Sequence, residues 1–138
     1  MTSLTDSADD DAISLAVVGA HLSGMPLNGE LQALGAVFVR TTVTAPSYRL
    51  YELPGTTPRK PGLLRVANGG HAIEVEIWSL PPAEFGLFVS RIPAPLGIGT
   101  LHLDGGEVAK GFLVEAVAVD GANDISHFGG WRAFATQR

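Results

Sequence analysis

Short apolar runs alternate with glycine- and proline-containing breaks along the chain, a pattern typical of strands joined by tight turns. β-Branched residues are enriched in 36–44, and apolar and polar side chains alternate in 72–79. The pattern predicts strands at residues 13–18, 36–44, 47–53, 63–66, 72–79, 100–103, 107–110 and 111–119.

Helical spacing is present in two segments. Leucines recur at spacings of four and three in 26–34, and two phenylalanines lie three apart in 82–90. A third helix can start at Asp124 or Ser126, which are suited to cap it. Together the elements predict an α+β fold: a small mixed, mostly antiparallel β-barrel with two or three short helices.

The length of 138 residues fits one domain, which we expect to span 13–138 after a disordered acidic tail at 1–12. A net charge of −5 argues against nucleic acid or an anionic membrane as the main partner. No apolar run is long enough to cross a bilayer, and the N-terminus lacks the features of a signal peptide. The composition therefore predicts a soluble cytoplasmic protein.

His21 is the first candidate for chemistry, because it directly follows a predicted buried strand and lies between Gly19 and Gly24. A glycine-rich turn at the carboxyl end of a strand can hold an anion with its backbone amides. An imidazole there can donate a proton near pH 7. The alternative is that the His21 ring only braces the turn, and the residues alone leave both interpretations open.

Glu74 and Glu76 lie two apart on one predicted strand and therefore share a face. They are either an acid or base facing a cavity or ordinary charges facing solvent, and the periodicity favours solvent. Arg49 and Lys110 are candidate anion holders, with solvated strand residues as the alternative.

Neither a metal nor another cofactor is expected. Cysteine is absent, and no two of the four histidines have the helical spacing of a zinc site. His71 and His102 are predicted to lie at the surface, whereas Trp131 is predicted to fill the core.

Several long strings of the chain resemble the C-terminal domain of allophanate hydrolase, over about residues 15–134. They are VVGAHLSGMPLN (17–28), APSYRLYELPGTTPRKPGL (45–63), IEVEIWSLP (73–81), FGLFVSRIPAPLGIGTLHL (85–103), KGFLVEA (110–116) and DISHFGGWRAF (124–134). The resemblance implies a fold similar to γ-glutamyl cyclotransferases. The segment RIPAPLGIG has no carboxylate where the cyclotransferases carry a catalytic glutamate, so cyclotransferase chemistry is not expected.

In the allophanate hydrolase family this domain follows an amidase domain and is thought to decarboxylate N-carboxycarbamate. The resemblance therefore implies that His21 donates a proton to a small anionic substrate. The residues expected to bind the substrate are Gly19, Ala20, Leu22, Ser23, Gly24 and Asn28, followed by Tyr48, Arg49, Glu74, Glu76 and Lys110.

Two functions stay open at this stage. The first is a cofactor-free enzyme that acts on a small carboxylated amide or carbamate in urea and allophanate catabolism. The second is a non-catalytic partner or ligand-binding module for a separately encoded amidase, since no amidase domain is expected before residue 1. The sparsely charged composition suits association with such a partner, and it also allows a homodimer.

Overall fold

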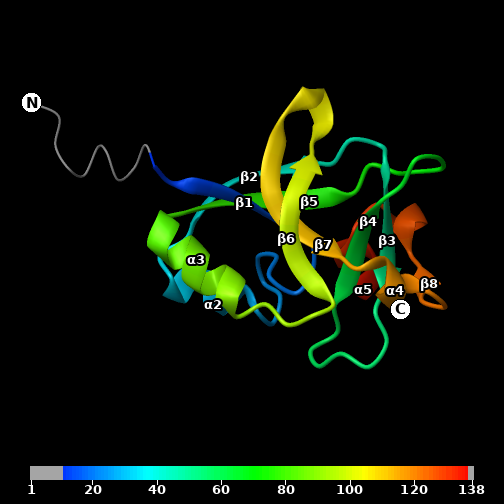
Figure 1. The fold of residues 1–138 in the computed structure, drawn as a ribbon, viewed down its shortest axis with the longest axis horizontal. Helices are drawn as coiled ribbons and strands as arrows, with labels where there is room; N and C mark the ends of the chain where they lie inside the picture. The colour runs from blue at the N-terminus through cyan, green and yellow to red at the C-terminus, as the bar shows by residue number, and fades with distance from the viewer. Residues whose placement is uncertain (1–10, 137–138) are drawn as a thin grey trace, which may run out of the picture.

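The computed structural model describes residues 11–136, which form eight strands and several short helices (Figure 1). The strands are β1 (Ile13–Val17), β2 (Val37–Val43), β3 (Tyr48–Glu52), β4 (Pro61–Arg65), β5 (Glu74–Leu80), β6 (Leu96–His102), β7 (Val108–Val114) and β8 (Asn123–Asp124). The helices are α2 (Asn28–Ala33), α3 (Pro82–Ser90), α4 (Ala116–Val119) and α5 (Trp131–Ala135), with 3-10 turns η1 (Asp104–Gly106) and η2 (Ser126–Phe128). The predicted tail, except for residues 11 and 12, lies outside the described residues.

The strands form one sheet in the order β2-β5-β1-β7-β6 and a second in the order β4-β3-β8. Within the described residues, β1 and β7 alone pair in parallel, and the other pairs are antiparallel. The predicted α+β class with mostly antiparallel pairing is therefore confirmed. The pairings within residues 11–136 form two sheets and no closed ladder, so the predicted barrel is not confirmed.

The centre of the larger sheet is β1, where Leu15, Ala16 and Val17 are fully buried. Its parallel neighbour β7 places Gly111 beside Ala16. A Cβ at Gly111 would lie 2.9 Å from the Ala16 Cβ, so this close approach requires glycine. The register also brings the next residue, Phe112, toward the end of β1, where the loop with His21 begins.

Some predicted boundaries are wrong. The strand predicted at 100–103 begins earlier, at Leu96, and the two strands predicted at 107–110 and 111–119 are joined in the single strand β7, which ends at Val114. Gly111 does not end β7, because it lies inside the sheet, where the lack of a side chain lets the strand pack closely against Ala16 of β1. Residues 116–119, predicted as strand, form α4.

The last helix begins at Trp131 and not at Asp124 or Ser126. Gly129 adopts a φ of +81° and ends the preceding turn η2, so the helix can start only after the glycine pair. Trp131 is buried in the core, as predicted.

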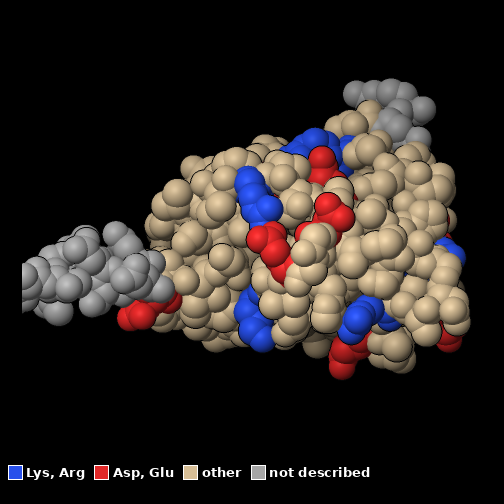
Figure 2. Space-filling model, turned by 90° about the horizontal axis from the view of Figure 1, so that it is seen from above, with Lys and Arg blue, Asp and Glu red and all other residues tan. Residues whose placement is uncertain are grey.

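The helices α2 and α3 lie at one end of the molecule, and the smaller sheet with α5 lies at the other (Figure 1). Charged side chains are scattered and of mixed sign on the face drawn in Figure 2. In the described part of the chain, each helix is too short or too polar to cross a bilayer.

Candidate active site

The loop that follows β1 is fixed by hydrogen bonds to its own backbone and to α2. The Leu27 amide donates to the Ala20 carbonyl at 2.8 Å. Asn28 donates from Nδ2 to the His21 carbonyl, also at 2.8 Å, and is itself buried. Two partners from the start of α2 therefore hold the backbone on which the His21 ring is mounted.

Gly19 sets how closely the neighbouring segments approach this loop. A Cβ at Gly19 would collide with the ring of Pro61, the first residue of β4. Glycine at this position lets the segment before β4, residues 54–60, lie against the turn after β1. Lys60 reaches the site from that segment.

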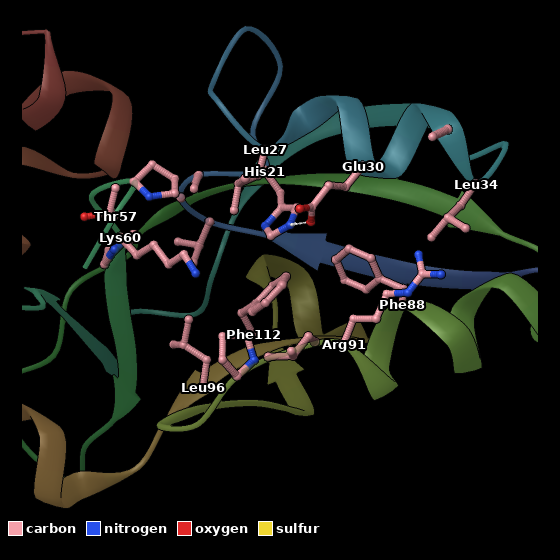
Figure 3. Close-up of a pocket in the computed structure, with 18 residues that line it drawn as sticks. His21, Leu27, Glu30, Leu34, Thr57, Lys60, Phe88, Arg91, Leu96 and Phe112 are labelled. Atoms are coloured by element: carbon pink, nitrogen blue, oxygen red, sulfur yellow. Dashed lines mark hydrogen bonds and ion pairs between the residues drawn. The ribbon is translucent and has the colours of Figure 1, made fainter. Parts of the chain in front are cut away.

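The His21 ring is packed between two phenylalanines (Figure 3). It stacks on Phe112 of β7, with ring centroids 5.2 Å apart, and meets the edge of Phe88 of α3 at 5.1 Å. Its Nε2 is hydrogen-bonded to Glu30 Oε1 at 2.9 Å. The ring is thus oriented by packing, and Nδ1 is left without a protein partner in residues 11–136.

Burial lowers the pKa of His21 below its ordinary value of 6.5, because removing the ring from water disfavours the charged imidazolium. The hydrogen bond and the charge of Glu30 act in the opposite direction, and the charge of Lys60 lowers the pKa further. The free imidazole is therefore mostly neutral at pH 7. Any anion that neutralises Lys60 would remove one cause of the depression.

A pocket of about 480 Å³ lies beside the His21 ring. It is formed where the loop after β1, the helices α2 and α3, the segment before β4, and β7 meet (Figure 3). Eighteen residues line it: Val18, Gly19, Ala20, His21, Leu27, Glu30, Ala33, Leu34, Thr57, Pro58, Lys60, Pro61, Phe88, Arg91, Ile92, Pro93, Leu96 and Phe112.

Two cations, Lys60 and Arg91, lie on different sides of His21 in this pocket (Figure 3). The segment carrying Lys60 is anchored by its neighbour Arg59, whose guanidinium lies 5.6 Å from the Trp131 ring and bonds Glu52 at 2.8 Å. Arg91 follows the last residue of α3 and is exposed at the rim. A small anion beside His21 would thus meet positive charge from two directions.

Of the residues predicted to bind substrate, Gly19 and Ala20 line the pocket together with His21. Leu22 is fully buried, and Gly24 and Ser23 lie further along the loop, outside the lining. At least one of the backbone amides predicted to hold an anion, that of Ser23, is already bonded to a side chain of the protein. Ser23 donates from its backbone N–H at 2.8 Å and from its hydroxyl at 2.9 Å to Glu76 Oε1.

Glu76 corrects the expectation that both glutamates of β5 face solvent. Its residue is only 4% exposed, and its carboxylate also accepts from Trp78 Nε1 and from Arg132 of α5. It joins the loop after β1 to β5 and α5, and it does not line the pocket. Glu74 is half-buried, 4.0 Å from Arg132, and also lies outside the lining.

We expect Glu76→Ala to lower the free energy of unfolding by about 2–4 kcal/mol, because it leaves buried donors without an acceptor. Chemical denaturation followed by circular dichroism measures the change. Glu107→Ala is the matched control, since Glu107 pairs with Arg40 at an exposed site and should cost less than about 1 kcal/mol. Equal losses for the two variants would show that the buried network does not hold the loop.

The remaining predicted binding residues have other partners. Tyr48 is buried and accepts from the His102 backbone at 2.9 Å, whereas Arg49 pairs with Asp124 at 2.6 Å. Lys110 is exposed and donates to Thr100. None of Tyr48, Arg49, Lys110 or Asn28 lines the pocket. His71 and His102, predicted at the surface, are both partly buried.

Three charged lining residues were not among those predicted: Glu30, Lys60 and Arg91. Lys60 lies in the string PRKPG, where a basic pair between prolines in a loop was an available signal. Glu30 and Arg91 reach the pocket only through the packing of α2 and α3. No group of three or more metal-ligating side chains occurs in residues 11–136.

Comparisons with known proteins point to one family. A model described as the allophanate hydrolase C-terminal domain matches residues 13–136. Urea amidolyase of Saccharomyces cerevisiae is 45% identical over 127 residues, which cover 89% of this chain and 7% of that protein. The chain thus spans about 7% of the length of the curated relatives it matches.

Solved structures agree. Kluyveromyces lactis allophanate hydrolase is 42% identical with a TM-score of 0.86, covering 90% of this chain and 21% of that one. A uropathogenic E. coli-specific protein is 36% identical with a TM-score of 0.84, covering 92% of this chain and 98% of that one. An aig2-like protein of Mus musculus, 17% identical with a TM-score of 0.59, shares the fold alone.

Proposed function

The chain belongs to the allophanate hydrolase C-terminal domain family, and from this premise we propose that its pocket decarboxylates a small carboxylated amide or carbamate. N-carboxycarbamate, the substrate that the resemblance implies, is the expected substrate, in the context of urea and allophanate catabolism. One observation carries the proposal: a buried, oriented imidazole borders a pocket that also contains Lys60 and Arg91.

The two cations account for binding. Lys60 and Arg91 would each take a carboxylate of the dianion, so that its nitrogen comes to lie near the His21 ring. The apolar walls of the pocket reduce the screening of these charges by water. No metal or organic cofactor is part of the proposed step.

The proposed reaction requires one proton. The His21 imidazolium gives its proton to the substrate nitrogen while the bond from that nitrogen to one carboxylate carbon breaks. The electron pair of the broken bond goes to nitrogen, CO2 leaves, and carbamate remains. The neutral imidazole then takes a proton from water, which completes the balance.

The lowered pKa of His21 is compatible with this role because the substrate is an anion. The bound dianion would offset the charge of Lys60 and favour the imidazolium, so the pKa would rise on binding. The site would then protonate His21 chiefly when a substrate is present to receive the proton.

We therefore expect the pKa of His21 to lie below 6.5 in the free protein and to rise when malonate binds. Malonate has two carboxylates on one carbon and resembles the dianion, with a methylene in place of the nitrogen. An NMR pH titration of the histidine ring signals measures both values. The His21 signals are assigned by comparison with the spectrum of a His21→Asn variant. An unchanged His21 pKa at saturating malonate would contradict the proposal.

A second function, a non-catalytic module that binds a separately encoded amidase, is favoured by one surface. The edge strand β2 exposes apolar side chains, with Val37 at 63% and Val39 at 50% exposure. Sedimentation of the chain mixed with such an amidase tests this, with a Val39→Lys variant to break the contact. Association that Val39→Lys abolishes, without turnover by the chain alone, would favour the module. Binding to an amidase, formation of a homodimer and a cytoplasmic location all stay predictions.

A further inference from the structure

The pocket is larger than the smallest substrate of the proposed reaction. N-carboxycarbamate has about seven non-hydrogen atoms, and even at a full water volume of about 30 Å³ for each atom it would occupy under half of the pocket volume of about 480 Å³. A ligand of that size leaves the rest of the pocket to water. The pocket therefore has room for a ligand larger than N-carboxycarbamate.

Apolar side chains form much of the wall of this remaining part, beside the charged groups of Glu30 and Arg91. On the side of His21 away from Lys60, Leu34 of the α2 end and Phe88 of α3 face the pocket (Figure 3). Ile92, in the turn after α3, also lines it. Leu34 and Ile92 are only partly buried, so their side chains stay in contact with water when no ligand is bound. Covering them with an apolar group is favourable.

We propose that, besides N-carboxycarbamate, the pocket takes an N-carboxylated amide, R–CO–NH–COO⁻, whose acyl group R is apolar and packs on Leu34, Phe88 and Ile92. This inference rests on the proposed function and specifies its substrate class. The carboxylate binds Lys60, and the acyl oxygen accepts from Arg91 at the rim. The proton passes from His21 to nitrogen, the bond from nitrogen to the carboxylate carbon breaks, and CO2 and the amide R–CO–NH2 leave.

Stable analogues test the inference. Monomethyl and monobutyl malonate both keep a carboxylate and a carbonyl on one carbon, and they differ by three methylenes. Each fully buried methylene raises affinity roughly fourfold, so we expect the butyl ester to bind at least tenfold more tightly in calorimetry. Equal affinities of the two esters would overturn the inference.

Variants locate the effect. Leu34→Ser should reduce the ratio of the two affinities severalfold, because it removes apolar surface that the butyl group is expected to cover. Leu87→Ser is the matched control, because Leu87 of α3 is exposed and lies outside the pocket. A ratio that Leu34→Ser leaves unchanged would place the butyl group elsewhere and overturn the inference.

The same data separate this inference from the proposed function. If both esters bind equally and Lys60→Met weakens both, the anion site stands and only the apolar acyl group is refuted. If neither ester nor malonate binds, both the substrate class and the proposed decarboxylase site are refuted. The comparison of the two esters within the wild-type protein does not depend on any variant folding.

Discussion

Replacing His21 by asparagine is expected to lower the rate of decarboxylation by about 100- to 10,000-fold, the usual contribution of a positioned proton donor. Asparagine keeps a side-chain donor near Glu30 but cannot deliver a proton to the substrate nitrogen. The assay generates ¹³C-labelled N-carboxycarbamate in situ with an allophanate-deaminating amidase. Loss of its carbon signal in ¹³C NMR then gives the rate with and without the chain.

The control for this variant is His127→Asn, which changes an exposed histidine outside the pocket lining. It should retain the wild-type rate, and circular dichroism should show both variants folded. Full activity of a folded His21→Asn protein would remove His21 from the mechanism. Loss of folding would be resolved by His21→Gln, which keeps a longer polar side chain in the same space.

Replacing Lys60 by methionine is expected to weaken malonate binding by about tenfold or more, because a charge-assisted hydrogen bond contributes roughly 1.5–3 kcal/mol. Methionine has nearly the same length as lysine and keeps the apolar part of the contact. Calorimetry measures the dissociation constant at fixed ionic strength, since salt screens partly exposed charges.

Lys110→Met is the matched control, because Lys110 is exposed on β7 and bonds Thr100 outside the pocket. It should leave malonate affinity within about twofold of wild type, an effect too small to reflect a lost contact. If Lys110→Met weakened malonate binding more than Lys60→Met, the anion site would lie outside the pocket described here.

Local sequence patterns were sufficient for much of the fold. The content of β-branched residues located β2, and the alternation of apolar and polar residues located β5. The two prolines at the start of α3 located that helix at 82–90. His21 could also be found, because its position after an apolar strand and between two glycines is a local feature. These predictions depend on neighbours in the sequence, which a single sequence contains.

The remainder depends on contacts between distant segments. The alternation along β5 predicts that Glu76 faces solvent. Its carboxylate instead accepts hydrogen bonds from Ser23 and Arg132, which lie 53 and 56 residues away in the sequence. Lys60 and Arg91 meet His21 only because β4 and α3 pack around the end of β1. Closure of a barrel likewise depends on pairings between sheets that no local pattern specifies.

The most direct test of the account is a crystal structure of the chain with malonate at a concentration near its measured dissociation constant. The account predicts one malonate in the pocket, with its carboxylates on Lys60 and Arg91 and its methylene against the His21 ring. Malonate bound at another site, with the pocket beside His21 left to water, would contradict it.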